Sequence, residues 1–274
     1  MSLQDKIIKS TGIPKCHSTL LDGESGTGKT DQYRALRKAG FNPLYASAEG
    51  KLATIADLEP DVWPIKSFDF PLTPSDSQLI KASGYGTSDM LALYHYLKNE
   101  DHPYDCLFMD SGMRIGEEMC LWLTKTTMSE KGNVDALRGY GLFADKMNMA
   151  MKAFHSLTDV GCKKPIHFVV TWGVAWSQDM YGRRKVQPIV EGKKFLPKLP
   201  YIFDNVFYMF GKEDVSEDGK SSIIRRYMGT TPTDTYYAKY SGGGVELPDV
   251  IDVTGHKLGL GDVLKKLTGV KDEK

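Results

Sequence analysis

The chain has 274 residues, of which 41% are hydrophobic and 26% are charged. That length suits one large domain or two small ones with a substantial core, and the composition excludes disorder, collagen and coiled coil. The 35 Lys and Arg residues balance the 35 Asp and Glu residues, so any contact with nucleic acid must come from a local patch. No apolar run is long enough to cross a membrane, and the first ten residues lack the apolar run of a signal peptide, so we expect a cytoplasmic protein that does not contact membranes.

Apolar runs of strand length alternate with helical patterns, which is typical of a largely parallel sheet with helical crossovers. We expect strands at 18–22, 42–48, 62–68, 105–110, 165–171, 201–210 and 222–228. We expect helices at 29–39, at 88–99 and over most of 111–160, where three glycines between 131 and 141 suggest a flexible crossing. Pro64 favours an edge position for the third strand, because proline cannot donate to a central ladder.

The chain divides into three parts. We expect an N-terminal tail (1–14), a single core (15–240) and a C-terminal appendage (241–274). The polar connection 214–221 joins the last two expected strands of the core as an antiparallel hairpin. The appendage contains a short helix at 261–267, which we expect to pack on its own domain.

A phosphate-binding loop stands between the first expected strand and the helix after it. Its sequence, Gly-Glu-Ser-Gly-Thr-Gly-Lys-Thr at 23–30, fits the pattern GxxxxGK[ST]. Glycine tolerates backbone conformations that let successive N–H groups turn inward and surround a phosphate at the positive end of a helix. The pattern predicts that Lys29 bridges the β- and γ-phosphates of ATP and that the Thr30 hydroxyl ligates Mg²⁺. The predicted nucleotide-binding residues are Gly23, Glu24, Ser25, Gly26, Thr27, Gly28, Lys29, Thr30 and Asp31.

Two acidic residues at strand ends complete the predicted site. Four apolar residues ending in Asp110 have the Walker B form, and this carboxylate would hold Mg²⁺ through water. The next residue, Ser111, replaces the glutamate that AAA+ ring machines usually carry there. Glu49 ends the second expected strand, where RecA-type ATPases have the glutamate that orients water against the γ-phosphate; the alternative is an ordinary exposed carboxylate. The sequence has no NKxD-type guanine motif, which favours ATP over GTP.

The chain resembles the phage P-loop nucleotide-binding family, which includes RecA-like single-strand annealing or recombination proteins. The resemblance is carried by the phosphate loop at 23–30, by Glu49 and by the strand that ends at Asp110. It is also carried by the strand at 167–171 and by the run Gly192-Lys193 … Leu199-Pro200 … Phe203-Asp204-Asn205-Val206. It covers about residues 15–239, and its specific part is the phosphate loop. It implies an α/β, RecA-like P-loop NTPase core with a mostly parallel central sheet flanked by helices. It also implies an ATPase that forms a ring or filament on single-stranded DNA in the host cytoplasm, with a phage annealing or single-strand-binding protein as a candidate partner.

The resemblance suggests roles for two further residues. Thr171 would be the polar sensor that reports the γ-phosphate from the end of its strand, although threonine also ends many strands through propensity alone. RecA-like subunits receive a cation from the neighbouring protomer, and we assign Lys239 to this role. Related phage proteins have Ala-Lys-Asp-Arg there, whereas this chain has Ala-Lys-Tyr-Ser at 238–241, so Arg225 and Arg226 are the alternatives.

A basic segment follows Thr171. Residues 172–200 hold six basic and two acidic residues, with Gly182 at an expected hairpin tip and aromatic residues between the cations. Cations that follow a backbone, together with aromatic faces for stacking, are typical of single-strand binding without sequence preference. The predicted nucleic-acid contacts are Arg183, Arg184, Lys185, Lys193, Lys194 and Trp176. The alternatives are a solvated hairpin with its tryptophans in the core, and a weaker nucleic-acid segment at 128–140.

Two other functions fit the same motifs. A small-molecule or nucleotide kinase also has a phosphate loop, and its arginine-rich lid could be the run Gly-Arg-Arg-Lys at 182–185. Phosphoryl transfer to a nucleoside or sugar, rather than to water, would identify such a kinase. A nucleotide-gated binding module with little turnover would need the loop but no catalytic role for Glu49.

Overall fold

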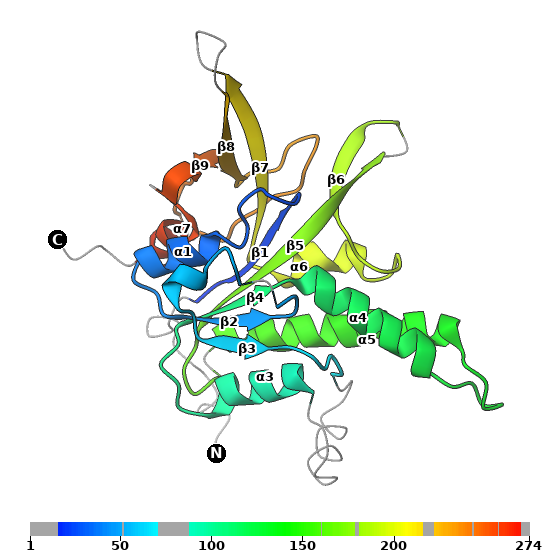
Figure 1. Ribbon diagram of the computed structural model, residues 1–274. Coiled ribbons are helices and arrows are strands. Elements are labelled where there is room, and N and C mark those ends of the chain that lie inside the picture. The colour runs from blue at the N-terminus through cyan, green and yellow to red at the C-terminus, as the bar shows by residue number, and fades with distance from the viewer. Residues whose placement is uncertain are drawn as a thin grey trace.

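The computed structural model describes residues 16–50, 52–70, 88–159, 161–178, 181–215, 222–242, 244–256 and 258–269 (Figure 1). The expected tail (1–14) and most of the connection before the last core strand (216–221) lie outside them. The strands are β1 (Ser18–Gly23), β2 (Pro43–Ser47), β3 (Val62–Pro64), β4 (Cys106–Asp110), β5 (His167–Gln178), β6 (Arg184–Pro188), β7 (Asn205–Val215), β8 (Ser222–Gly229) and β9 (Val250–Asp252). The helices are α1 (Gln32–Lys38), α3 (Asp89–Asn99), α4 (Gly112–Thr126), α5 (Ala136–His155), α6 (Leu199–Ile202) and α7 (Leu260–Thr268). Within these ranges, no helix combines the length and the apolarity that crossing a membrane requires.

The strands of the described residues form one sheet in the order β3-β2-β4-β5-β1-β7-β8-β9, with β6 paired to β5. Neighbouring strands from β3 to β7 are parallel, whereas β7, β8 and β9 are antiparallel. β3, which ends in Pro64, lies at the edge as predicted. The carboxyl ends of parallel strands share one edge, so Gly23, Ser47 and Asp110 come together there. The expected fold class, an α/β RecA-like P-loop NTPase core with an antiparallel hairpin near the C-terminal side, is confirmed.

Helices cover both faces of the parallel part of the sheet (Figure 1). On β1, Leu20 packs in the core cluster that includes Phe154 of α5, and Leu21 packs in the cluster that includes Leu36 of α1 and Leu264 of α7. Successive strand residues point to opposite faces, so a strand that is buried on both sides reads as a continuous apolar run. This double burial holds β1, and with it the start of the loop, in the middle of the core.

The C-terminal helix α7 packs on α1 of the same chain, as expected. The Leu260 backbone N–H donates to Gln32 Oε1 at 2.9 Å. A Cβ atom on Gly261 would lie 2.5 Å from the Cβ of Ala39, so glycine permits the close approach of the two helices. β9 also pairs with β8, so the segment after residue 241 adds both a strand and a helix to the core.

Several expected boundaries were wrong: the strand expected at 201–210 is β7 and begins only after α6, and the strand expected at 62–68 ends at Pro64. Gly139 and Gly141 do not mark a crossing, because both lie inside α5 and the break falls at 127–135. A Cβ atom on Gly139 would lie 2.7 Å from the Leu123 carbonyl oxygen, so this glycine allows α5 to lie close to α4. The expected strand that ends at Thr171 instead continues to the end of β5 and forms a hairpin with β6, because antiparallel pairing with β6 supports it beyond the parallel sheet.

Candidate functional site

The loop between β1 and α1 has the backbone shape that a phosphate site needs. The φ angles of Gly26 and Gly28 are +80° and +90°, which residues with side chains rarely adopt. A cavity of about 540 Å³ opens over the loop. Its lining includes Lys29, Thr30, Glu49, Asp110 and Thr171. Apart from Lys239, the residues that we predicted to be catalytic therefore line one cavity.

Asp110 is at the centre of the hydrogen bonds in this cavity. Its Oδ2 atom accepts from the Thr30 hydroxyl at 2.7 Å and from the Tyr45 hydroxyl at 2.6 Å. Its Oδ1 atom accepts from the Thr171 hydroxyl at 2.5 Å. These three donors come from the loop, from β2 and from β5, so the Walker B strand β4 lies between the elements that orient its carboxylate.

Sequence reasoning missed Tyr45, which looks like an ordinary core residue of β2. Its ring packs against Phe108 at 5.8 Å and Tyr33 at 5.5 Å between ring centroids. Burial, and then the negative charge of Asp110, raise the pKa of Tyr45, so its hydroxyl stays protonated and donates. The only sequence signal was the general need of a buried tyrosine hydroxyl for a partner.

The residues at the cavity fit a magnesium ion. The Thr30 hydroxyl and the Asp110 carboxylate meet at 2.7 Å, and both are the oxygen ligands that this ion prefers. Within the described ranges, no cluster of three or more His, Cys, Asp or Glu side chains could hold a metal alone. Mg²⁺ usually keeps several waters and is bound with substrate phosphates, so a pair of protein oxygens suffices.

Lys29 folds back on the loop. Its Nζ atom donates to the carbonyl oxygens of Gly23 and Glu24, both at 2.7 Å. Burial lowers the pKa of Lys29, while the carboxylates of Asp110 and Asp22 act in the opposite direction. Asp22, at the end of β1, was also missed: it is buried, and its Oδ1 atom has no hydrogen-bond partner among the described residues.

Asp22→Asn should change how stability depends on pH. Burial raises the pKa of Asp22 from 3.8 to about 8, although Lys29 opposes this shift. The folded protein therefore keeps a proton that the unfolded chain releases, and the stability from this group is lost as the pH rises from about 4 to about 8, by up to about 1.4 kcal/mol per pH unit.

The free energy of unfolding in urea, measured at several pH values, checks this expectation. Asp22→Asn should give a flatter profile than the wild type and a more stable protein near the upper end of that range. Asp101→Asn, at a side chain with 90% exposure, should keep the wild-type slope. Equal slopes for the wild type and Asp22→Asn would contradict the assignment.

Glu49 is held beside the cavity by Ser111. The Ser111 hydroxyl donates to Glu49 Oε1 at 2.8 Å, and the Gly50 N–H donates to the Ser47 hydroxyl at 3.0 Å, which supports the turn after β2. Ser111 also caps α4 by accepting from the Arg114 N–H at 3.3 Å. The peptide bond between Asp110 and Ser111 is cis. The residue that stands where AAA+ machines have a glutamate thus positions a glutamate from the turn after the neighbouring strand β2.

The predicted trans cation lies away from its own chain's cavity. The Lys239 backbone pairs with Val206 of β7, which neighbours Leu20 of β1, before the end of that strand. Of the two alternatives, Arg225 forms an ion pair with Asp214 at 2.7 Å and turns away from the loop. Arg226 instead lines the cavity of its own chain.

The predicted nucleic-acid residues divide between the β5–β6 hairpin and the segment before α6. On the hairpin, Arg183 and Arg184 are exposed, and the guanidinium carbon of Arg183 lies 5.3 Å from the Tyr181 ring centroid. Lys185 is partly exposed on β6. Lys193 and Lys194 follow the hairpin, and Lys194 pairs with Asp145 at 2.9 Å.

The tryptophans of this segment have different environments. Trp172 is buried and donates to the Ile189 carbonyl oxygen at 2.6 Å, so it cannot stack on a base. Trp176 is 52% exposed, and its indole N–H donates to Glu24 Oε1 in the phosphate loop at 2.5 Å. The hairpin therefore contacts the loop directly.

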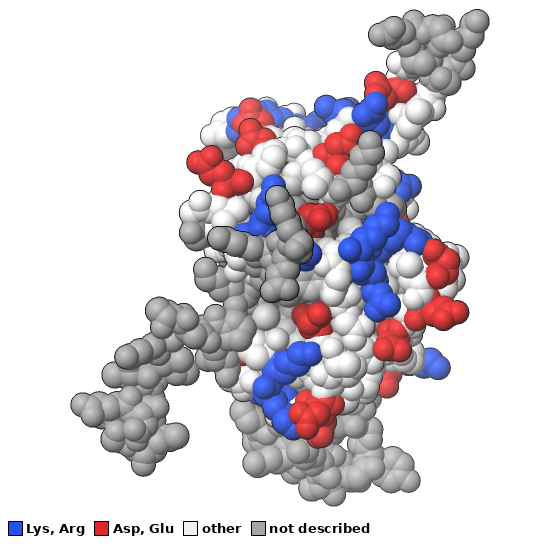
Figure 2. Space-filling view, turned by 90° about the vertical axis from the view of Figure 1, so that its left-hand side faces the viewer, with Lys and Arg blue, Asp and Glu red and all other residues white. Residues whose placement is uncertain are grey.

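Figure 2 shows the face where α1 and α7 lie, on which the described Lys and Arg residues stand in small groups beside Asp and Glu.

A known protein family covers the residues of this site. A family model described as AAA domain matches residues 17–241, a range that holds the loop, Glu49, Asp110 and Thr171. Among solved structures, the chain is similar to the flagellar accessory protein FlaH from Methanocaldococcus jannaschii, with 13% identity, a TM-score of 0.38, and coverage of 89% of this chain and 87% of that chain. No curated protein matches the sequence. Because the family model covers most of the chain and includes the whole phosphate site, the protein belongs to the AAA domain family of P-loop NTPases.

Proposed function

We propose that this protein is a Mg²⁺-dependent ATPase that acts on single-stranded DNA as a RecA-like ring or filament in phage recombination or replication. The observation that carries the ATPase part is the convergence of the loop, Glu49, Asp110 and Thr171 on one cavity. The contact of the β5–β6 hairpin with Glu24 supports the DNA part, because it joins the basic segment to the phosphate loop.

Each cavity residue has a separate role in the proposed hydrolysis. The loop N–H groups and Lys29, which can exchange its two carbonyl acceptors for phosphate oxygens, bind the triphosphate. Thr30 and Asp110 would hold Mg²⁺, which neutralises phosphate charge when it is bound. Glu49, oriented by Ser111, accepts a hydrogen bond from the attacking water and takes its proton. Thr171 fixes the second oxygen of Asp110 and would sense the γ-phosphate through it.

The hairpin provides the DNA contact in this proposal. Arg183, Arg184 and Lys185 lie together near its tip, and the exposed face of Trp176 is available for stacking. A DNA base that stacks on Trp176 would compete with or reinforce the hydrogen bond between the Trp176 indole N–H and Glu24. DNA binding would in this way alter the loop that holds the phosphates.

An ATPase assay with and without single-stranded DNA, run beside a particle-size measurement, tests the proposal. We expect magnesium-dependent hydrolysis that rises with DNA, and particles larger than one chain. Intact ATP binding with no stimulation by any polynucleotide would contradict the DNA role. Phosphoryl transfer to an added nucleoside instead of water would identify the kinase alternative.

Replacing Arg183, Arg184 and Lys185 together with alanine should weaken the salt dependence of DNA binding. Each phosphate contact on a single strand of DNA adds about 0.7 to the steepness of the plot of log affinity against log salt concentration. The plot for the variant should therefore be less steep by about two. A matched control replaces three exposed lysines on α1, α4 and α5, Lys38, Lys125 and Lys152, and should keep the wild-type slope. An unchanged slope in the hairpin variant would move the DNA path elsewhere.

A further inference from the structure

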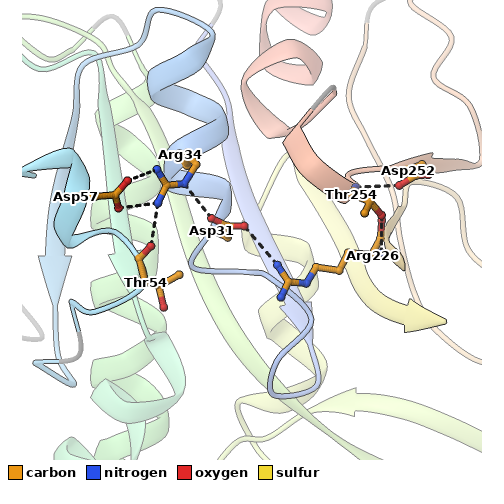
Figure 3. A network of polar contacts seen from close by, with 7 residues as sticks. All are labelled: Asp31, Arg34, Thr54, Asp57, Arg226, Asp252 and Thr254. Carbon is orange, nitrogen blue, oxygen red and sulfur yellow. Dashed lines mark hydrogen bonds and ion pairs between the residues drawn. The ribbon is translucent and has the colours of Figure 1, made fainter. Parts of the chain in front are cut away.

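Arg226 reaches the phosphate loop from β8, which β7 separates from β1 in the sheet (Figure 3). Its backbone is held firmly on β8: its N–H donates to the Thr254 hydroxyl at 2.9 Å, and its carbonyl oxygen accepts from the Val253 N–H at 2.9 Å. Its side chain extends toward the loop and lines the same cavity as Lys29 and Asp110. The fixed backbone thus directs the long, positively charged side chain of Arg226 toward the nucleotide cavity.

The guanidinium lies directly over the third loop glycine. A Cβ atom on Gly28 would lie 2.9 Å from Arg226 Cδ and 3.5 Å from its Nε and Nη1 atoms. The backbone N–H groups around Gly28 are among those that surround phosphates in loops of this pattern. Arg226 therefore stands close to the positions that bound phosphates would take.

Two arginines flank Asp31, and Arg226 has more donors to spare. Arg34 uses four of its five N–H donors: it bonds Asp57 through two nitrogens at 2.6 and 2.7 Å, Asp31 at 3.3 Å and the Thr54 carbonyl oxygen at 3.1 Å (Figure 3). For the Arg226 guanidinium, the described residues provide one partner, Asp31, at a long 3.4 Å. The remaining donors of Arg226, whose side chain is 43% exposed, are accessible from the cavity.

We infer that Arg226 binds the phosphates of the nucleotide held by its own chain, with Asp31 holding the guanidinium in place until the nucleotide arrives. The inference rests on the proposed function and deepens it. A phosphate is a better partner than the carboxylate at 3.4 Å, because guanidinium and phosphate oxygens can form two short, charge-assisted hydrogen bonds. The arginine also offsets the repulsion between Asp31 and the phosphates.

Equilibrium binding of ATP, ADP and adenosine to the full chain tests this role. Arg226→Ala should weaken ATP and ADP binding about 10- to 100-fold, as expected for the loss of hydrogen bonds to a charged group, and should leave adenosine binding unchanged. Arg226→Lys should recover part of the loss, because an ammonium keeps the charge but not the paired geometry. Asp31→Asn should tighten ATP binding, because it frees Arg226 and removes a negative charge beside the phosphates.

Arg225→Ala is the matched control. Arg225 is the neighbouring residue on β8, pairs with Asp214 and Asp252, and points to the opposite side of the strand, so its loss should leave ATP affinity unchanged. The thermal midpoint of each nucleotide-free variant shows whether the fold is retained. A wild-type ATP affinity for a folded Arg226→Ala would overturn the inference, as would an equal loss for adenosine, which would indicate stacking on the base.

A mixing experiment separates action within the chain from action on a neighbour. If Arg226 acted on the partner's nucleotide, adding Lys29→Ala protein, which keeps its arginine, would restore hydrolysis to Arg226→Ala protein. We expect no such rescue, and rescue would overturn the inference. A wild-type chain that bound no ATP would instead refute the proposed function, so the two failures can be told apart.

Discussion

Glu49→Gln is expected to lower the rate of ATP hydrolysis by about 10²- to 10⁴-fold while ATP binding is retained. The amide keeps an oxygen that can accept the hydrogen bond from Ser111, now at 2.8 Å, so the side chain should stay in place. It cannot take a proton from water, so the chemical step should fail while the phosphate contacts remain. Steady-state hydrolysis and equilibrium ATP binding, measured on the same preparation, separate the two effects.

The control for this variant is Glu100→Gln, an exposed glutamate at the end of α3, which should hydrolyse ATP at the wild-type rate. Ser111→Ala should have a smaller effect than Glu49→Gln, about 10-fold, because it loosens the base without removing it. If Glu49→Gln hydrolysed ATP as fast as the wild type, Glu49 would not be the base and the nucleotide-gated module would become the better description.

Lys29→Ala is expected to reduce ATP affinity about 10- to 100-fold or more. The loss follows from the hydrogen bonds that an ammonium makes to charged phosphate oxygens. In the structure, this lysine donates to two loop carbonyl oxygens at 2.7 Å and is not a member of the hydrophobic core clusters of the described residues, so the fold should persist. Isothermal titration with ATP measures the affinity, and circular dichroism checks the fold.

Lys38→Ala provides the comparison for Lys29→Ala, because Lys38 lies exposed in the last turn of α1, at the other end of the same helix. Its loss should leave ATP affinity unchanged. Retained affinity in a folded Lys29→Ala protein would show that the loop is not a phosphate site, and the proposed ATPase would fall with it.

The carboxyl-end residues of the parallel strands were predictable because their geometry follows from the fold class. Once a strand, a phosphate loop and a helix are read in order, the ends of neighbouring parallel strands must meet beside the loop. Glu49, Asp110 and Thr171 could therefore be assigned from local patterns, and the structure brings all three to one cavity. The prediction failed for Gly139, because glycine in a close helix crossing and glycine in a flexible link look the same in a sequence.

The residues that sequence reasoning missed have their roles through partners that are distant in the chain. Tyr45 meets Asp110 across 65 residues, and Ser111 meets Glu49 across 62. Nothing in the apolar run of β2 separates a tyrosine that donates to the carboxylate of Asp110 from one that only fills the core. The sequence also showed no sign of the raised pKa of Asp22, because that shift comes mainly from burial in the folded protein.

The sequence by itself determined the phosphate loop, since its glycines, lysine and threonine are contiguous and act mainly through their own backbone. Only the tertiary structure decided which of two neighbouring arginines reaches the phosphate loop. Arg225 and Arg226 are equivalent in the sequence, but strand alternation sends one to Asp214 and the other across 195 residues to Asp31, at the start of α1. The antiparallel addition of β8 beyond β7 sets that register, and long-range pairing of this kind depends on the packing of the whole sheet rather than on local pattern.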